Sequence, residues 1–233
     1  MSAEVIHLDD PAISVLLRRS RAARRFTLSL RPREEPARLT APSAARRAEA
    51  ERFLDRHADW LRDAISRTPA AECVAVGASL PVDGAPRRIE ALPMRGAVRL
   101  EGERLLAPSR ATARAVAGWL KLRARDRLVP AAEAAAARIG REVGRVTLRD
   151  TRSRWGSCTR RGDLSFSWRL AMAPPEVLDY VACHEAAHLV EMNHGPAFWA
   201  LVAQLRPDYR VQRAWLRREG ARLHGYRFDD AGG

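Results

Sequence analysis

The sequence predicts an α+β fold with a β-rich N-terminal portion and a helical C-terminal portion. Two observations carry this prediction. Short alternating segments separated by glycine turns fill the first hundred residues, whereas from residue 109 onward apolar side chains recur mostly at helical spacing. A length of 233 residues suits one sizeable domain, or one with a small appendage. We therefore expect a β-rich region over residues 1–108, a second domain over 109–226 and a loose tail over 227–233.

The N-terminal region is expected to contain short strands around one helix. Residues 26–30 (Phe-Thr-Leu-Ser-Leu) alternate with period two, as in a half-buried strand. From residue 44 to residue 65 the apolar side chains follow helical spacing, and Ser43 can serve as N-cap. Thr68-Pro69 closes this segment, so we predict a helix at about residues 43–66.

Two hairpins follow this helix. Asp83-Gly84 lies between apolar segments at 80–82 and 88–90, a pattern typical of a tight hairpin turn. A second turn is expected at Gly102, and Pro108 ends the region.

The C-terminal region begins with a long helix. Ser109 is its expected N-cap, Pro130 is a point where it kinks or restarts, and it stops before Gly140. A strand at 145–148 precedes a hairpin formed by residues 155–158 and 164–170 around Gly162. Three more helices are expected, beginning at Pro174-Pro175, at Pro196 and at about Tyr209; the first runs through Leu189 and the last to about Leu223.

Composition excludes several classes of protein. Hydrophobic residues make up 46% and charged residues 30%, which argues against wholesale disorder, and no apolar run is long enough to span a bilayer. We see no secretory signal, and three scattered cysteines do not form a disulfide framework, so a cytoplasmic location is expected.

The net charge of +13 favours polyanionic partners, but nearly all the basic residues are arginine, Lys121 being the single lysine. Such a surplus of arginine, together with abundant alanine, is also typical of a GC-rich genome. Nucleic-acid binding is therefore a possibility that the sequence does not favour.

One short segment carries metal chemistry. His184 and His188 are four residues apart, so on a helix both imidazoles can reach one ion, and Zn²⁺ is the expected occupant at one per chain. Glu185 follows the first histidine and is placed to take a proton from a water molecule. His194 is a candidate third ligand only if the helix breaks. We predict the break at Met192-Asn193, with Gly195-Pro196 starting a new helix.

These residues resemble the YgjP-like metallopeptidase family of small zincins. The resemblance covers about residues 110–223 strongly and is carried by the run at 154–158, the strand at 164–170, Asp179-Tyr180-Val181, the two histidine motifs and Phe198-Trp199. WLM-type and SprT-like proteases, which cut proteins crosslinked to DNA, are similar relatives. The resemblance implies a zincin-like domain, zinc held by three histidines, Glu185 as general base and a sheet edge strand beside the cleft.

One residue departs from the related metzincin pattern. Metzincins place a glycine where this chain has Glu191, so the turn toward the third histidine must be made differently, and we expect it at Asn193.

Three functions remain open at this stage. The first is a zinc metallopeptidase that uses Glu185. The second is a nucleotide pyrophosphatase of UTP type at the same site, because some family members are described in that way. The third is a nucleic-acid-binding protein with a structural zinc, against which stand Glu185 and the position that three histidines leave open. The substrate is therefore a peptide, a protein or a nucleotide; no membrane partner is expected, and the oligomeric state is undetermined.

Several neighbouring residues have both a functional and a packing interpretation. Arg154 and Tyr180 are candidate substrate or oxyanion contacts, although packing is the more common role for such a tyrosine. Trp155 and Trp168 are expected in the core and not in a stacking platform. Cys158 and Cys183 are interpreted as small buried residues. Arginines also crowd the predicted hairpin, where they either steer an anionic substrate or form a solvated face; they are Arg152, Arg154, Arg160, Arg161 and Arg169.

Overall fold

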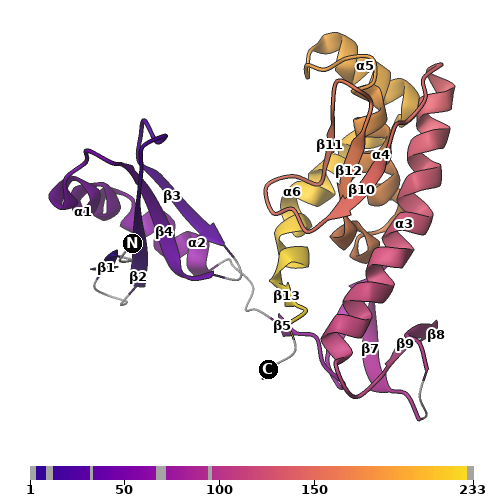
Figure 1. The fold of residues 1–233 in the computed structure, drawn as a ribbon, viewed down its shortest axis with the longest axis horizontal. Coiled ribbons are helices and arrows are strands. Elements are labelled where there is room, and N and C mark those ends of the chain that lie inside the picture. Colours follow the sequence, from indigo (N-terminus) through magenta and orange to yellow (C-terminus); the bar gives the residue numbers. More distant parts are fainter. Residues whose placement is uncertain (1–3, 9–12, 32–33, 67–71, 94–95, 230–233) are drawn as a thin grey trace. The chain divides into compact units, whose positions relative to one another are not determined.

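The computed structural model describes residues 4–8, 13–31, 34–66, 72–93 and 96–229 (Figure 1). The chain divides into two compact units, residues 1–71 and 72–233. We expected the division at 108–109. It falls earlier because the sheet formed by residues 79–107 packs into the same hydrophobic core as the C-terminal helices. The predicted α+β class is confirmed, since both units combine helices with sheets.

The N-terminal unit is a four-stranded sheet with two short helices. The sheet has the order β1-β2-β4-β3, in which β2 and β4 are parallel and the other two pairs are antiparallel. Its core contains Val15, Leu39, Leu54 and Leu61, all fully buried. The elements are β1 (Glu4–Leu8), β2 (Ile13–Ser20), β3 (Thr27–Arg31), β4 (Glu34–Pro42), α1 (Arg47–Arg56) and α2 (Ala58–Ser66).

The single helix expected at 43–66 is in fact two helices that meet at His57. Its predicted N-cap, Ser43, is wrong: Arg46 is the N-cap, and its backbone N–H is held by the Glu49 carboxylate at 2.8 Å. Two local hydrogen bonds accompany the break. The His57 ring bonds the carbonyl of Phe53 at 2.7 Å, and the His57 backbone N–H bonds the carbonyl of Leu54.

The larger unit has two main sheets and four long helical segments. The first sheet has the order β6-β7-β9-β8 and the second the order β10-β12-β11, which leaves β11 at a sheet edge. A further pair, β13 and β5, joins the end of the unit to its beginning. The strands are β5 (Glu72–Cys73), β6 (Ser79–Val82), β7 (Ala85–Ala91), β8 (Arg99–Glu101), β9 (Arg104–Ala107), β10 (Val146–Arg149), β11 (Gly156–Cys158), β12 (Leu164–Ser167) and β13 (Tyr226–Arg227). The helices are α3 (Thr112–Arg138), η1 (a 3₁₀ helix, Trp168–Met172), α4 (Pro175–Ala187), α5 (Pro196–Leu205) and α6 (Tyr209–Gly225).

Both predicted hairpins of the first sheet are present. Asp83 and Gly84 adopt φ values of 52° and 79°, the left-handed pair that a two-residue turn between twisted strands requires. Gly102 adopts φ 58° between β8 and β9. Asp83 also accepts ion pairs from Arg123 and Arg127, which attaches the turn to α3.

The long helix α3 differs from the prediction at its start. Ala111, in the left-handed region, is its N-cap in place of Ser109, and the Thr112 hydroxyl donates to the carbonyl of Pro108 at 2.7 Å. The helix runs through Pro130 as one element and does not restart. Its buried face, which includes Leu128 and Ala132, packs against α4, and this packing offsets the hydrogen bond that proline removes.

Strand β12 is shorter than expected, because the chain turns into η1 at Trp168. This turn buries Arg169 completely. Its guanidinium bonds Asp150 at 2.6 Å, donates to the carbonyls of Leu223 (2.8 Å) and Tyr226 (3.2 Å), and lies over the ring of Trp168. Arg169 therefore links the sheet to the C-terminal helix and is not available to a substrate.

Replacing Arg169 with methionine is expected to destabilise the larger unit by about 2–3 kcal/mol. The substitution keeps the apolar stem but leaves the buried Leu223 carbonyl without its donor, and an unsatisfied buried group costs about 1–3 kcal/mol. Urea unfolding measured alongside Arg152→Met, an exposed neighbour, tests this effect. Equal stabilities of the two variants would contradict the structural role of Arg169.

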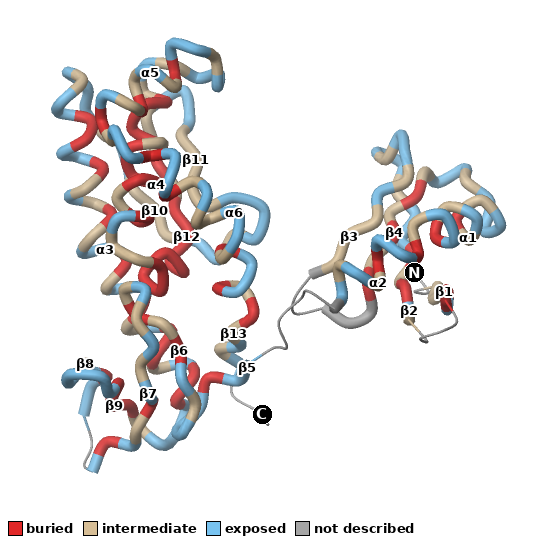
Figure 2. The backbone as a smooth tube through the Cα atoms, turned by 180° about the vertical axis from the view of Figure 1, so that it is seen from behind, coloured by how far each residue is buried: buried red, intermediate tan, exposed pale blue. Residues whose placement is uncertain are grey.

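Helix α4 lies at the centre of the larger unit and is buried over most of its length (Figure 2). It packs against α3, α5, α6 and the edge strand β11. The tail predicted over 227–233 begins later than expected, because Arg227 pairs with Cys73 and Phe228 packs edge-on to Trp168 at 5.0 Å; residues 230–233 lie outside the described residues. No helix of the described chain combines the length and apolarity needed to cross a membrane.

Candidate metal centre

The last turns of α4 present three of the predicted site residues. His184 and Glu185 are in the helix, which ends at Ala187 with His188 as C-cap. Glu185 is 4% exposed and His188 9%, so both side chains are held inside the unit.

The chain leaves α4 earlier than the sequence suggested. The helix breaks at His188 and not at Met192-Asn193 as predicted, although the chain does bend at Asn193, whose carbonyl accepts the N–H of Gly195 at 2.7 Å. The N–H of Leu189 bonds the carbonyl of Ala186, and the N–H groups of Val190 and Glu191 bond the carbonyl of Ala187. These bonds end the helix in a tight turn, and the chain then bends at Asn193 to bring His194 back. No residue of the described segment 188–195 adopts a positive φ. No left-handed residue is needed there, and Glu191 can replace a glycine.

The reversal brings the three histidines together. One ligand atom from each of His184, His188 and His194 lies within 4.8 Å of the others, and no further His, Cys, Asp or Glu of the described chain joins the group. The Nε2 atoms of His184 and His194 are 3.1 Å apart. His194 is exposed and is supplied by the loop before α5, which begins at Pro196 with Gly195 as N-cap.

The protonation of these imidazoles suits a metal. Nδ1 of His188 lies 2.9 Å from the carbonyl of Glu191, so this nitrogen carries the proton and Nε2 keeps a free lone pair. Burial, with the neighbouring His188 and His194, lowers the pKa of His184 to about 3, so its ring stays neutral at physiological pH. Two imidazole nitrogens at 3.1 Å repel when both present lone pairs, and a shared cation removes that repulsion. The three residues therefore fit a divalent metal ion with nitrogen ligands.

Aromatic side chains surround the cluster and hold the rings. Phe198 is fully buried and packs against all three imidazoles, with ring centroids 4.5–4.9 Å apart. Trp199 donates its indole N–H to the carbonyl of His194 at 3.1 Å and stacks on the His194 ring. The loop that carries the exposed histidine is thus attached to α5.

Glu185 sits beside the cluster, pressed against the edge strand β11. A Cβ atom placed on Gly156 would lie 2.5 Å from both Cγ and Oε1 of Glu185, so only glycine leaves room for this carboxyl group. Burial raises the pKa of Glu185 to about 8, while the charge of Arg154 lowers it. A buried carboxyl group of raised pKa is able to exchange a proton near neutrality.

A cleft of about 390 Å³ joins these groups. The three histidines, Glu185, Gly156 and Arg154 all line it, together with Trp155, Ser157, Cys158, Tyr180, Val181, Met192 and Leu216. The edge strand β11 forms one wall, as the sequence resemblance implied.

A family comparison matches residues 26–219 to the model of the YgjP-like metallopeptidase domain. The chain belongs to the YgjP-like family. No curated protein and no solved structure matches it. The match covers most of the chain, including part of the N-terminal unit, so the family extends beyond the metal centre itself.

In this YgjP-like chain the two candidate contact residues both line the cleft. Arg154 is exposed at its margin, whereas Tyr180 is 5% exposed and packs edge-on to His184. Burial raises the pKa of Tyr180 to about 12, so its hydroxyl keeps its proton and can donate a hydrogen bond. Tyr180 is therefore both a packed residue and a residue that lines the cleft.

The remaining tryptophan and cysteine residues considered in the sequence divide into core residues and residues that line the cleft. Trp168 is in the core, as expected, but Trp155 is half-buried, lines the cleft and stacks on His224 at 4.8 Å. Cys183 is buried; Cys158 is only partly buried, and desolvation raises the pKa of its thiol to about 11. The neutral thiol is a small cleft-lining group and lies outside the metal cluster.

The role of Gly156 was not predicted from the sequence, although Gly156 lies within residues 154–158, which carry the family resemblance. The available signal was a glycine inside a strand, which often marks the close approach of another group. Substituting Gly156 with alanine in this YgjP-like chain is expected to displace the Glu185 carboxyl group and lower hydrolysis by at least about tenfold, since misplacement by 1 Å can cost about 100-fold.

The matched control for Gly156→Ala is Gly118→Ala, because nothing lies within 4 Å of a Cβ at Gly118. Both variants are compared for steady-state hydrolysis, bound metal and circular dichroism. If Gly156→Ala turns over as fast as Gly118→Ala, the close approach of Gly156 does not position Glu185.

Proposed function

We propose that the protein is a zinc-dependent metallopeptidase in which His184, His188 and His194 hold the metal and Glu185 is the general base. The observation that carries this proposal is the combination, in one cleft, of three imidazoles within 4.8 Å and a buried carboxyl group beside them. Family membership supports the same class of reaction.

Bound zinc would supply Lewis-acid polarisation of a scissile carbonyl and would lower the pKa of a water molecule toward about 7. Glu185 would accept a proton from the attacking water at a carboxylate oxygen and return it to the leaving amine nitrogen. The close contact with Gly156 would fix the position of the Glu185 carboxylate. Tyr180 and Arg154 line the same cleft and are the candidate donors to the oxyanion.

The geometry favours a catalytic ion over a structural one. Structural zinc sites take four protein ligands, whereas the described residues bring three histidines together and no fourth ligand. A bound ion would therefore keep a position for which the described chain supplies no ligand, and a water molecule or a substrate group in the cleft could occupy it. This argues against the alternative of a nucleic-acid-binding protein with a structural zinc.

Hydrolysis of a nucleotide phosphoanhydride is the second candidate, and one observation favours it. A pocket next to the metal cluster is lined by Arg141, Arg160 and Arg161 as well as by His188. Guanidinium groups bind phosphate oxygens in a bidentate manner, so this pocket could receive a triphosphate.

One experiment separates the two candidates. The zinc-loaded full chain is incubated with unfolded protein and, separately, with UTP, with Glu185→Gln as the matched inactive variant. Release of new peptide amino groups by the wild type alone supports the metallopeptidase. Release of pyrophosphate from UTP, with no peptide cleavage, supports the pyrophosphatase and overturns our proposal.

A further inference from the structure

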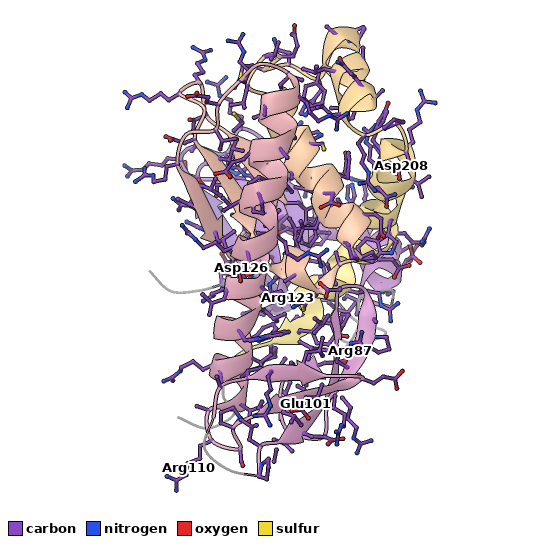
Figure 3. The ribbon with its side chains drawn as sticks, turned by 90° about the vertical axis from the view of Figure 1, so that its right-hand side faces the viewer. Arg87, Glu101, Arg110, Arg123, Asp126 and Asp208 are labelled. Atoms are coloured by element: carbon purple, nitrogen blue, oxygen red, sulfur yellow. The ribbon has the colours of Figure 1, made fainter. Side chains whose placement is uncertain are left out.

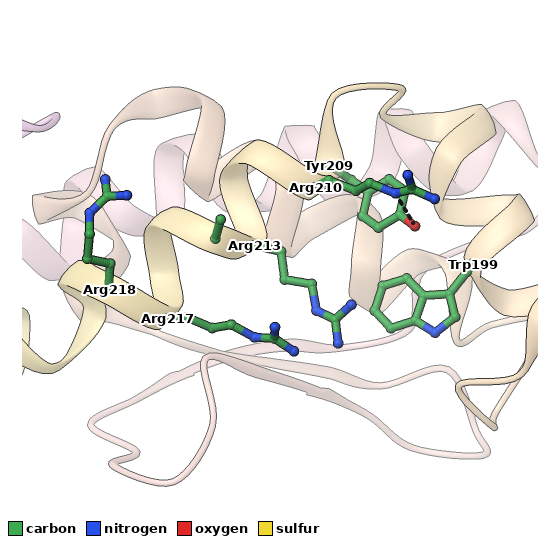
Figure 4. Close-up of a pocket in the computed structure, with 7 residues that line it drawn as sticks. Trp199, Tyr209, Arg210, Arg213, Arg217 and Arg218 are labelled. Carbon is green, nitrogen blue, oxygen red and sulfur yellow. Dashed lines mark hydrogen bonds between the residues drawn. The ribbon is translucent and has the colours of Figure 1, made fainter.

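Beside the metal cleft lies a second and larger groove, of about 690 Å³, on the face of α6 that meets α5 (Figure 4). Its lining combines guanidinium groups with two aromatic rings. The lining residues are Trp199, Tyr209, Arg210, Arg213, Ala214, Arg217 and Arg218.

Three of its arginines carry uncompensated charge. Positions 210, 213 and 217 recur at helical spacing and therefore share one face of α6. Among the described residues, Arg213 and Arg217 have no carboxylate partner, and the contact of Arg210 is with the Tyr209 hydroxyl. Arg218 differs, since it pairs with Glu219 at 2.8 Å and points away from the other side chains in Figure 4. The groove is therefore strongly cationic.

Contacting aromatic side chains link the groove to the metal cleft, although no residue lines both. Trp199 borders the groove and also donates to the carbonyl of His194. Tyr209 borders the groove and stacks on Tyr180, which lines the cleft. Residues that line the groove thus contact residues that line the cleft, and a polypeptide is long enough to reach both.

The aromatic rings are not free to stack on nucleobases. Trp199 already stacks on Tyr209 (centroids 5.4 Å apart) and on His194 (5.7 Å), and Arg213 lies 4.3 Å from the centre of its ring. Single-stranded nucleic acids are usually held by exposed aromatic faces along a basic groove. Here the rings of Trp199 and Tyr209 pack against other side chains of the protein. The guanidinium groups are the part of the groove that remains available to a ligand.

We propose that this groove binds acidic side chains, so that the protein favours polypeptide substrates with aspartate or glutamate next to the cleaved bond. The proposal rests on the metallopeptidase function proposed above and names its substrate class. Carboxylates match the geometry of arginine, and Arg213 and Arg217 extend toward the same side of α6 (Figure 4).

The test measures binding separately from cleavage. Fluorescence anisotropy follows a labelled peptide that contains a Glu-Asp stretch, and a second peptide that carries Gln-Asn instead, on the full-length Glu185→Gln protein with and without zinc. The acidic peptide is expected to bind at least about tenfold more tightly, and its affinity should fall with salt because the contacts are ionic.

Adding Arg213→Gln and Arg217→Gln should remove most of this preference. The matched control removes two exposed arginines elsewhere, Arg88→Gln and Arg110→Gln. Arg110 lies beside the β8–β9 hairpin, at the opposite end of the unit from Asp208 and the start of α6 (Figure 3). The control should keep the preference within about twofold. Arg213 contacts Trp199, so its replacement could disturb the metal centre. The single variant Arg217→Gln avoids this contact, and an unchanged zinc content in this variant shows that a lost preference does not come from a damaged metal centre.

Three results would overturn the proposal. The acidic and amide peptides could bind alike, the control pair could lose as much affinity as the groove pair, or an oligonucleotide could displace the peptide with tighter, groove-dependent binding.

The groove proposal and the metallopeptidase proposal fail in different ways. If the wild type cleaves no peptide but the preference for the acidic peptide still depends on Arg217, the peptidase function is refuted and the groove remains an anion site. Peptide cleavage without that preference refutes the groove alone.

Discussion

Glu185→Gln is expected to retain zinc and the fold while losing hydrolysis by about 100- to 10,000-fold, the range typical for removal of a general base. The amide has nearly the same size as the carboxyl group, so it fits the space against Gly156. It cannot accept the proton of the attacking water. Because Glu185 lies outside the group of three histidines, the loss should appear in turnover and not in metal content.

Turnover of Glu185→Gln is measured on unfolded protein, and zinc by elemental analysis after gel filtration. Glu176→Gln is the matched control, since Glu176 is an exposed carboxylate in the first turn of the same helix and lies outside the cleft. Turnover of Glu185→Gln close to that of Glu176→Gln would exclude Glu185 as the base. Loss of zinc from Glu185→Gln would instead make it a ligand.

His194→Ala is expected to weaken zinc binding by at least about 100-fold, because the cluster offers three ligands and two imidazoles alone form an incomplete site. His194 is exposed, so its removal should leave the unfolding free energy of the metal-free protein almost unchanged. His188→Ala should weaken binding as strongly but also removes the contact with the Glu191 carbonyl, which makes it the less specific variant.

Zinc affinity is measured by competition with a chromogenic chelator, with His7→Ala as control because His7 belongs to the N-terminal unit and its ring contacts Ser14. Wild-type affinity in His194→Ala would remove this residue from the ligand set. Loss of affinity in His7→Ala as well would show that the effect is not specific to the cluster.

The sequence by itself determined the features that depend on neighbours along the chain. The spacing of His184 and His188 places both imidazoles on one face of α4, because a helical turn repeats every 3.6 residues. Asp83-Gly84 predicted its hairpin for an equally local reason, since these residues tolerate the left-handed backbone of the turn. The α+β class and the convergence of a third histidine also followed from patterns within short segments.

Tertiary structure decided the features that depend on contacts between distant segments. Gly156 matters because Glu185, 29 positions later, needs the volume that a side chain would fill, and no pattern within one strand records that need. Arg169 lay among arginines that the sequence left open as substrate contacts or a solvated face, yet it is buried, bonded to Asp150 and to the carbonyls of Leu223 and Tyr226.

Two of the boundaries that sequence reasoning placed differently have different causes. The chain divides at residue 71 because the sheet of residues 79–107 shares its apolar core with α3 and α4, whereas composition changes at residue 108. Helix α4 ends at Ala187, although apolar spacing continues to Leu189, because the reversed segment is held by its own backbone bonds and by the ring of His188. Local propensity thus indicated the candidate residues for the chemistry. Burial and through-space packing determined how they are held and which arginines remain available to a substrate.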